Sequence, residues 1–339
     1  MPSLYNKTPL VQQTFTDGES DSPQFFIKSE FSQPGGSFKS RGIGYLISKS
    51  AARIEEGSGK PPHVYCSSGG NAGLAAATAS EILSLPCTVV VPRTTKESMI
   101  SKIRDRGAEV IVKGSHWKEA DFHLCESIIK SAEGSKHVPI YVHPFDNSEI
   151  WDGHSSIVDE IIESLKSEHI DLDRLKGIVC SVGGGGLFNG VIRGLERHNL
   201  AHQVPVVAVE TKGCDVLNAS LRAGHQVTLE KITSVASSLG SVYTPKETFD
   251  YATKYNTKSV VLDDIAVLET CLKYAQSNNV AVEPACGASI HLAYNPDILE
   301  HALGTSLKKY DVIVVIACGG SAVTTEEVSR TLSVLKNEK

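Results

Sequence analysis

Eight short runs rich in β-branched residues alternate along the chain with longer stretches of helical period. The runs stand at residues 63–66, 87–91, 108–112, 139–142, 177–182, 205–209, 258–262 and 311–317. The helical stretches include residues 71–83, 96–106, 149–166, 264–277 and 321–336. Strands that alternate with helices form parallel sheets with crossover helices. The pattern therefore predicts an α/β protein with mainly parallel sheets.

The first four runs and their helices could close on themselves as a smaller domain. We expect this domain at residues 37–143 and a larger one made of residues 1–36 and 144–339. Residues 52–62 are interpreted as a polar surface loop, and the stretch 211–250 has few periodic signals. A chain of 339 residues that is 41% hydrophobic can form two such cores.

Charge and cysteine usage narrow the class of protein. The net charge is −6 with acidic and basic residues interspersed, which argues against nucleic-acid or anionic-membrane partners. The eight cysteines form no Cys-x-x-Cys pair, so we expect reduced, buried thiols and no zinc site. No apolar run approaches the roughly 20 residues of a membrane span, and the N-terminus has no signal core. We expect a cytoplasmic protein.

Three glycine-rich segments stand where an expected strand passes into the following segment. They read CSSGGNAG from residue 66, SVGGGGLFN from residue 181 and ACGGS from residue 317. Backbone N–H groups in such turns, aided by a helix N-terminus, bind anions, and a phosphate is the natural occupant of the tetraglycine segment. Loops at the carboxyl ends of strands converge on one crevice in open α/β sheets, so the three segments suggest one shared ligand.

Each segment also has a simpler interpretation. The tetraglycine segment could be a flexible turn, and the serines and asparagine after residue 66 could only cap a helix. A dinucleotide fingerprint is a sharper alternative for the tetraglycine segment, although the acidic residue expected about 20 residues further on fits the spacing poorly. Residues 36–41 read GSFKSR, in which Lys39 is either a Schiff-base lysine or part of an ordinary solvated helix start.

Five segments in the same order resemble the pyridoxal-phosphate enzymes of the L-serine/threonine dehydratase family, most closely the eukaryotic L-serine dehydratases. They are SFKSRG at 37, SSGGNAG at 67, SVGGGGL at 181, EPACGA at 283 and ACGGS at 317. The stretches PFDNSEIWDGHSSIVDE at 144 and KITSVASSLG at 231 are also similar. The resemblance covers nearly the whole chain. It implies fold type II of these enzymes, which is similar to the tryptophan synthase beta subunit, with two open twisted α/β domains.

The resemblance also implies roles for individual residues toward pyridoxal 5'-phosphate. Lys39 would form the Schiff base and later take the α-proton, and Phe38 would pack beside the pyridine ring. Asn71 would bond the phenolic oxygen, and Cys318 would face the pyridine nitrogen. The phosphate would be held by Gly183, Gly184, Gly185, Gly186 and Leu187.

The substrate and a cation would have their own residues under the same resemblance. The substrate carboxylate would be taken by Ser67, Ser68, Gly69 and Asn71. A monovalent cation such as potassium would lie near Glu210, Cys214 and Leu239. Some members carry alanine at the position of Gly69, which leaves the serine-to-threonine preference open. His143, His154, Glu283 and the pair Asp263 and Asp264 are interpreted as structural groups.

The function expected from the resemblance is that of an L-serine dehydratase of amino-acid catabolism and gluconeogenesis, acting as a homodimer. It would convert L-serine to pyruvate and ammonia and L-threonine to 2-oxobutanoate. A β-replacement enzyme of the same fold, similar to a cysteine synthase, is the first alternative. A nucleotide-binding oxidoreductase, a non-catalytic binder that uses the tetraglycine segment, and a relative without turnover remain open.

Overall fold

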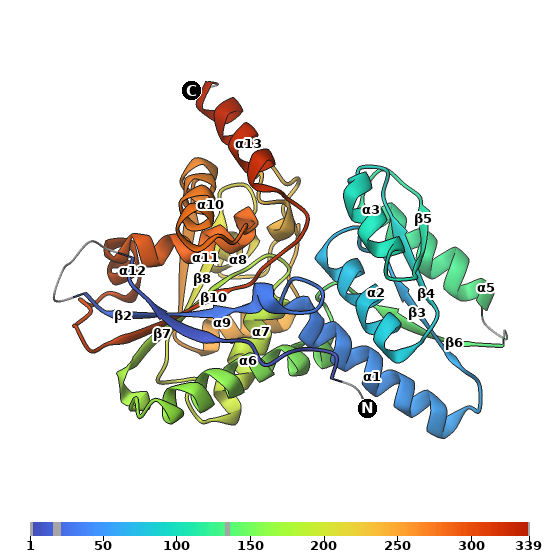
Figure 1. Ribbon diagram of the computed structural model, residues 1–339, viewed down its shortest axis with the longest axis horizontal. Helices are drawn as coiled ribbons and strands as arrows, with labels where there is room; N and C mark the ends of the chain where they lie inside the picture. Colours follow the sequence, from blue (N-terminus) through green and yellow to red (C-terminus); the bar gives the residue numbers. More distant parts are fainter. Residues whose placement is uncertain (1–2, 16–21, 133–135, 338–339) are drawn as a thin grey trace. The chain divides into compact units, whose positions relative to one another are not determined.

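The computed structural model describes residues 3–15, 22–132 and 136–337. The chain forms two compact units (Figure 1): unit 1 comprises residues 1–6 and 33–153, and unit 2 comprises residues 7–32 and 154–339. The division falls within helix α6 (Ser148–Ser167). The extreme ends of the larger expected domain, residues 1–2 and 338–339, lie outside the described residues. The domain limits at 37 and 143 stay a prediction.

Unit 1 is built on a four-stranded sheet in the order β5-β4-β3-β6, in which all neighbouring strands are parallel. Parallel neighbours need crossover connections, and helices provide most of them here. The elements of unit 1 that precede α6 are α1 (Lys39–Gly57), β3 (Pro62–Cys66), α2 (Asn71–Leu83), β4 (Cys87–Val91), α3 (Glu97–Arg104), β5 (Glu109–Val112), α4 (Trp117–His123), the π-helical segment η2 (Leu124–Ile129), α5 (Lys130–Ala132) and β6 (Val138–Val142).

Helices cover both faces of this sheet. Gly73 of α2 lies against Val89, whereas the next residue of the strand, Val90, shares a core with Ala120 of α4 and Leu124 of η2. Successive strand residues point to opposite faces, so α2 and α4 lie on opposite sides of β4. A strand buried on both faces is a continuous apolar run, which explains why β4 reads CTVVV.

Unit 2 is built on a six-stranded sheet in the order β1-β2-β10-β7-β8-β9, in which only the pair β1 and β2 is antiparallel. The elements of unit 2 besides α6 are β1 (Leu10–Gln13), β2 (Gln24–Ser29), η1 (Glu30–Ser32), η3 (Leu172–Arg174), β7 (Leu175–Ser181), α7 (Gly186–Arg197), β8 (Val206–Thr211), α8 (Val216–Ala223), η4 (Ser237–Leu239), α9 (Lys246–Lys254), β9 (Thr257–Leu262), α10 (Asp264–Asn278), α11 (Pro284–Tyr294), α12 (Pro296–Leu303), β10 (Val312–Ala317) and α13 (Thr325–Asn337).

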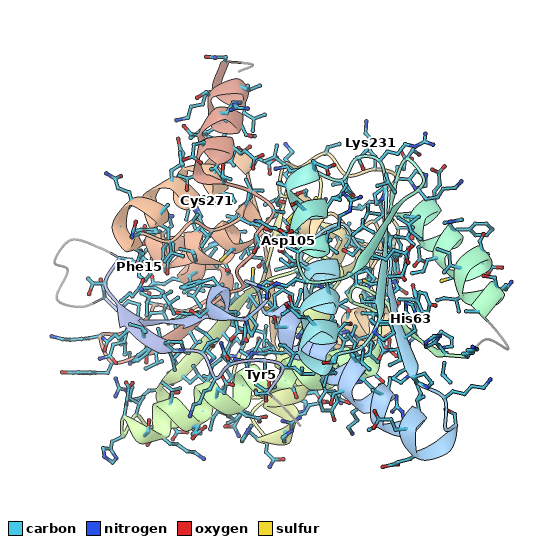
Figure 2. All side chains as sticks on the ribbon, turned by 45° about the vertical axis from the view of Figure 1, so that its right-hand side comes forward. Tyr5, Phe15, His63, Asp105, Lys231 and Cys271 are labelled. Atoms are coloured by element: carbon cyan, nitrogen blue, oxygen red, sulfur yellow. The ribbon has the colours of Figure 1, made fainter. Side chains whose placement is uncertain are left out.

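The core of unit 2 centres on β10, whose six residues VIVVIA are all buried. Helix α11 packs on β10, β7 and β8 (Figure 1). The Ser289 hydroxyl of α11 donates to the Ile316 carbonyl of β10 at 2.9 Å. Phe15, labelled in Figure 2, packs edge-on against Tyr294 and Phe25, with ring centroids 4.8 and 5.9 Å away. These contacts join the end of α11 to β2.

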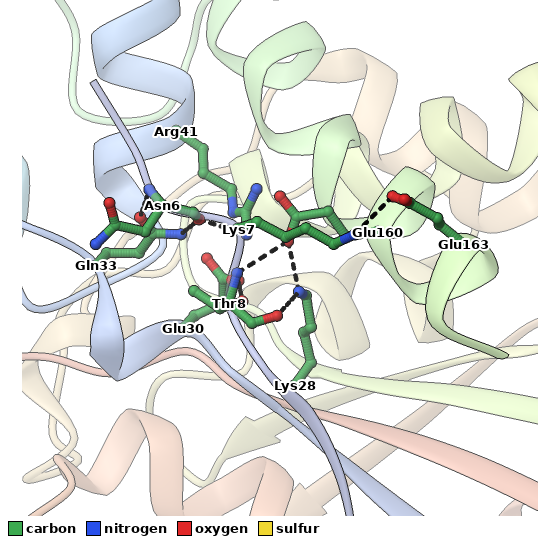
Figure 3. Close-up of polar contacts among 9 residues, drawn as sticks. All are labelled: Asn6, Lys7, Thr8, Lys28, Glu30, Gln33, Arg41, Glu160 and Glu163. Carbon is green, nitrogen blue, oxygen red and sulfur yellow. Dashed lines mark hydrogen bonds and ion pairs between the residues drawn. The ribbon is translucent and has the colours of Figure 1, made fainter. Parts of the chain in front are cut away.

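A buried polar cluster ties three segments of unit 2 together (Figure 3). Lys28 of β2 has no exposed surface, and its Nζ lies 2.5 Å from a carboxylate oxygen of Glu160 in α6. Lys28 also donates to the Thr8 carbonyl at 2.6 Å, and the Thr8 hydroxyl donates to Glu30 at 2.6 Å. A buried charge is tolerated only when it is paired, as here.

The expected secondary structure is largely confirmed. A strand of the structure overlaps each of the eight apolar runs, and each of the five named helical stretches contains a helix. The expected loop at 52–62 was wrong for residues 52–57, because α1 continues to Gly57, and only residues 58–61 form a loop before Pro62 opens β3. All eight cysteines are free, and all except Cys125 are buried, which confirms their expected burial.

The structure adds elements that the sequence pattern did not indicate. The strands β1 and β2 were not expected, nor was α11, which is buried along nearly all of its length and so has no amphipathic period. The stretch 211–250 contains α8 and the start of α9, joined by mostly irregular backbone. Among the described helices, none is both long enough and apolar enough to cross a lipid bilayer.

Candidate active site

Lys39 is the first residue of α1, and its side chain is held by the segment that precedes α6. Its Nζ donates to the Pro144 carbonyl at 2.6 Å and lies 5.1 Å from the centroid of the Phe38 ring. The side chains of Phe38 and Lys39 are half-buried. The hydroxyl of Ser37, two residues before the lysine, is buried and has no hydrogen-bond partner within the described part of the chain. The start of α1 therefore presents the Lys39 amine and, two residues earlier, the buried Ser37 hydroxyl, which could form a hydrogen bond with a ligand or ordered water.

His143 completes the surroundings of Lys39 in unit 1. Its Nδ1 accepts the N–H of Asp146 at 2.8 Å and that of Phe145 at 3.3 Å. Burial lowers the pKa of His143 to about 4, with the nearby Asp121 carboxylate opposing and the Lys39 charge reinforcing this shift. The imidazole is therefore neutral near pH 7 and organises a turn, which agrees with its expected structural role.

The loop after β3 is shaped by close backbone contacts. A Cβ on Gly73 would stand 1.9 Å from the Ser68 carbonyl oxygen, so only glycine fits there. The Leu74 N–H donates to the Gly70 carbonyl at 3.1 Å as α2 begins at Asn71. The Ser68 hydroxyl accepts the Gly70 N–H at 3.3 Å. Amides at the start of α2 lack intrahelical acceptors, so the loop can receive a carboxylate.

Ser67 differs from Ser68 in its surroundings. Ser67 has no exposed surface, and its hydroxyl donates to Oδ1 of Asp121 in α4 at 2.6 Å. The Tyr141 hydroxyl of β6 donates to the same oxygen at 2.7 Å. Sequence reasoning missed Asp121, because no motif surrounds it and only the fold brings α4 to the end of β3.

The tetraglycine loop of unit 2 connects β7 to α7. A Cβ on Gly183 would stand 2.8 Å from the Leu239 Cα, and one on Gly185 would stand 2.3 Å from the Thr248 hydroxyl oxygen. Gly185 also has a φ of +82°, which favours glycine. The Asn189 N–H donates to the Gly185 carbonyl at 2.9 Å, where the helical ladder starts. The amides before it are left for a ligand, and a phosphate fits them.

Two buried polar side chains near this loop lack partners. The Thr248 hydroxyl and both amide atoms of Asn189 have no hydrogen-bond partner among the described residues, although both residues are fully buried. Buried polar groups are nearly always paired, so these atoms fit a polar ligand or ordered water in this region. The tetraglycine cradle and these atoms together are compatible with a phosphorylated cofactor.

Cys318 lies directly after β10, the strand that neighbours β7. Its Sγ accepts the Ser181 hydroxyl at 3.6 Å, so the fold brings Cys318 close to the start of the tetraglycine loop. Burial and a hydrogen bond with Cys318 raise the pKa of Cys286. The thiols around Cys318 are therefore neutral.

Glu283 orients the segment that follows Cys318. Its Oε1 accepts the Ala322 N–H at 2.6 Å, and its other oxygen accepts the Ser238 hydroxyl. A Cβ on Gly320 would stand 2.1 Å from the Glu283 carboxyl carbon. The expected role in orienting a loop is confirmed. Asp263 is likewise confirmed as a cap, because it accepts the Ile265 N–H at 3.0 Å.

The residues expected near a cation also lie in unit 2. The buried carboxylate of Glu210 accepts the N–H groups of Leu217 and Asn218 at 2.9 and 2.7 Å, and burial raises its pKa to about 8. Cys214 and Leu239 share a small core cluster, and Leu239 is the residue that Gly183 approaches. Within the described ranges, no three His, Cys, Asp or Glu side chains gather as a metal cluster.

The expected site residues fall into two sets. Unit 1 positions Lys39, Phe38, Ser67, Ser68, Gly69 and Asn71. Unit 2 positions Gly183, Gly184, Gly185, Gly186, Leu187, Cys318, Glu210, Cys214 and Leu239. Within unit 2, the loops after β7 and β10 stand at the same end of neighbouring parallel strands, as predicted.

Comparison with known proteins gives matches over nearly the whole chain. A family model described as "Pyridoxal-phosphate dependent enzyme" matches residues 2–319. The chain is 55% identical to the catabolic L-serine/threonine dehydratase of Saccharomyces cerevisiae (strain ATCC 204508 / S288c), over 100% of this chain and 93% of that protein. It is 57% identical to an L-serine dehydratase of Saccharomyces cerevisiae (strain AWRI1631), over 98% of each chain.

Among solved structures, the chain is similar to a fungal L-serine ammonia-lyase from Rhizomucor miehei. The TM-score is 0.84 at 30% sequence identity, and the match covers 98% of this chain and 100% of the other.

Proposed function

Because the chain belongs to the family of pyridoxal-phosphate dependent enzymes, we propose that it is an L-serine dehydratase that also acts on L-threonine. The full-length similarity to dehydratases carries this proposal, since it extends over the segments that hold Lys39, the loop after β3, the tetraglycine loop and Cys318. The products are pyruvate and ammonia from L-serine, and 2-oxobutanoate and ammonia from L-threonine. The enzyme is thus a lyase of amino-acid catabolism.

The cofactor supplies an electron sink for the bond that breaks at the substrate Cα. Lys39 would hold the cofactor covalently, and its Nζ, which donates to the Pro144 carbonyl at 2.6 Å, would then serve as the base for the α-proton. The amides of the tetraglycine loop and of Leu187 would bind the phosphate. Asn71 would bond the phenolic oxygen, Phe38 would pack beside the ring and Cys318 would face the pyridine nitrogen.

The substrate carboxylate is assigned to the loop after β3, through Ser67, Ser68, Gly69 and Asn71. The support is the start of α2, whose amides lack intrahelical acceptors. A monovalent cation such as potassium is assigned to the surroundings of Glu210, Cys214 and Leu239. The proposal also includes assembly as a homodimer, location in the cytoplasm and a role in gluconeogenesis. The free cysteines support a reducing compartment.

The experiment that tests the function combines a spectrum, a trapping reaction and a product assay. The holoenzyme is expected to absorb near the visible edge and to form pyruvate from L-serine. Borohydride is expected to attach the cofactor permanently to Lys39. The Lys39→Ala variant should lose turnover by roughly 10²–10⁴-fold or more. Lys49→Ala is the matched control, because Lys49 is an exposed lysine of the same helix. Full turnover by Lys39→Ala would refute the assignment.

A second set of reactions separates the alternatives. Sulfide with L-serine or O-acetylserine would give cysteine in place of pyruvate if the enzyme catalysed β-replacement. A colourless protein that binds a nicotinamide cofactor would indicate an oxidoreductase. A yellow protein without turnover would indicate a relative that has lost activity.

A further inference from the structure

One carboxylate oxygen of Asp121 accepts hydrogen bonds from two hydroxyl groups. Ser67 donates to it at 2.6 Å and Tyr141 at 2.7 Å. An ionised carboxylate only accepts hydrogen bonds, and a serine hydroxyl has one proton. The Ser67 proton is therefore engaged with Asp121 and is not free for a substrate.

Three titratable groups that interact with Asp121, namely Tyr141, Cys66 and His143, are kept neutral near pH 7 by burial. Burial, followed by the hydrogen bond to Asp121, raises the pKa of Tyr141 far above its usual range. Burial also raises the pKa of Cys66 to about 12 and lowers that of His143 to about 4. A substrate carboxylate at the Ser67 hydroxyl would stand one hydroxyl away from the Asp121 carboxylate, and like charges at that distance repel.

Asp121 is held in place by its own helix. The preceding residue, Ala120, and the later Leu124 have no exposed surface and pack in a core with Tyr65 and Val90 of the sheet. Leu124 begins the π-helical segment η2, and such segments occur frequently at functional sites. The backbone at Asp121 is therefore fixed against the sheet by the residues that flank it.

Ser68 has the opposite arrangement. Its hydroxyl oxygen accepts the Gly70 N–H at 3.3 Å, and the residue is half-buried. Among the described residues, no acceptor takes the Ser68 proton. This hydroxyl is therefore available to donate to a ligand.

We infer that Asp121 is a positioning residue of the substrate loop: it holds the Ser67 hydroxyl, so that Ser68, and not Ser67, donates its hydroxyl proton to the substrate carboxylate. The inference rests on the proposed function, which supplies an amino-acid substrate. It distinguishes the hydroxyls of Ser67 and Ser68, which the resemblance placed together among the residues that take the substrate carboxylate.

The two serines are compared first in the holoenzyme. Ser68→Ala is expected to raise the KM for L-serine by roughly tenfold or more, the usual effect of losing a hydrogen bond to a charged group, with a smaller change in kcat. Ser67→Ala should raise the KM for L-serine clearly less than Ser68→Ala does. The dissociation constant of L-alanine, read from the cofactor's absorbance, should follow the same order, because L-alanine has the carboxylate and no β-hydroxyl. An effect of Ser67→Ala equal to or larger than that of Ser68→Ala would overturn the inference.

The role of Asp121 is tested by a graded pair of variants. Asp121→Ala leaves the Ser67 and Tyr141 hydroxyls without their acceptor, whereas Ser67→Ala removes the buried hydroxyl itself. Asp121→Ala should therefore raise both the KM and the L-alanine dissociation constant by roughly tenfold. Asp121→Asn keeps an acceptor oxygen and should restore most of the affinity. Tyr141→Phe removes only the second donor, so its effect should be smaller than that of Asp121→Ala. Unchanged L-alanine binding in Asp121→Ala would contradict the inference.

Stability and function are separated by two controls. The Tm of each apoenzyme shows whether a variant is folded. The dissociation constants of L-alanine are compared only among folded variants. If Asp121→Ala fails to fold, the comparison of Ser67→Ala with Ser68→Ala decides. A wild-type holoenzyme that forms no pyruvate from L-serine would refute the proposed function. An active wild type with the serine order reversed would refute only the inference.

Discussion

Thr95 occupies the space into which a side chain at Gly69 would point. A Cβ built on Gly69 would stand 2.3 Å from the Thr95 Oγ1 and 2.5 Å from its Cγ2. Such distances are shorter than any real carbon contact, so one of the two residues must move if position 69 carries a side chain. The segment after β4 therefore constrains the loop after β3 within unit 1.

Gly69→Ala should thus impair the enzyme, whereas the double variant Gly69→Ala/Thr95→Ala should recover most of the loss. Removing the Oγ1 and Cγ2 atoms leaves only the Thr95 Cβ, 3.0 Å from the new methyl group, which a small shift can relieve. We expect kcat/KM for L-serine to fall about tenfold in the single variant, the cost of overpacking a fixed loop. Steady-state kinetics of the two single variants and the double variant measure this coupling. Additive losses would contradict it.

Gly185→Ala should weaken cofactor binding. The new methyl group would collide with the Thr248 hydroxyl, and the φ of +82° would cost about 1 kcal/mol or more for an L-residue. We expect the dissociation constant of pyridoxal phosphate to rise at least about tenfold, because the loop must distort. Titration of the apoenzyme followed by absorbance measures it. Gly57→Ala is the control, because a Cβ on Gly57 meets no atom within 4 Å, and an equal effect there would exclude the loop as the cause.

Lys28→Met should destabilise unit 2 strongly, because it leaves the Glu160 carboxylate without its buried cation (Figure 3). Breaking a buried pair from one side costs about 3–5 kcal/mol in the free energy of unfolding. The exposed pair of Lys7 and Glu163, also drawn in Figure 3, provides the control, and Lys7→Met should cost less than about 1 kcal/mol. Urea unfolding of both variants measures the difference. Equal costs would show that burial of the Lys28 pair has no energetic consequence.

The sequence predicts those features whose cause is local. β4 and β10 are apolar runs long enough to be identified as buried strands, and Gly185 of the tetraglycine segment has the positive φ that favours glycine in a tight turn. β1 could not be predicted, because it is a four-residue edge strand without a distinctive pattern.

The partners of the substrate loop are beyond the reach of sequence motifs for a different reason. Asp121 reaches Ser67 across 54 positions of the chain, and Thr95 reaches Gly69 from the turn after the neighbouring strand. Neither residue stands in a glycine-rich or catalytic pattern. The role of Asp121 depends on α4 packing at the end of β3, and that of Thr95 depends on the turn after β4 lying beside the loop after β3. Both arrangements are properties of the packed unit.

The pH dependence of stability should have a contribution from His143. Burial lowers its pKa from 6.5 to about 4, so the unfolded chain binds a proton between these values that the folded chain does not. Stability from this group is complete above pH 6.5 and is lost as the pH falls toward 4, by about 3 kcal/mol. His143→Asn keeps an acceptor for the Asp146 N–H and should reduce the difference in unfolding free energy between pH 7 and pH 5. Part of the slope should persist, because burial also lowers the pKa of His63 and His291. The exposed His225→Asn should leave the slope in place, and an equal reduction in that control would show that His143 is not its source.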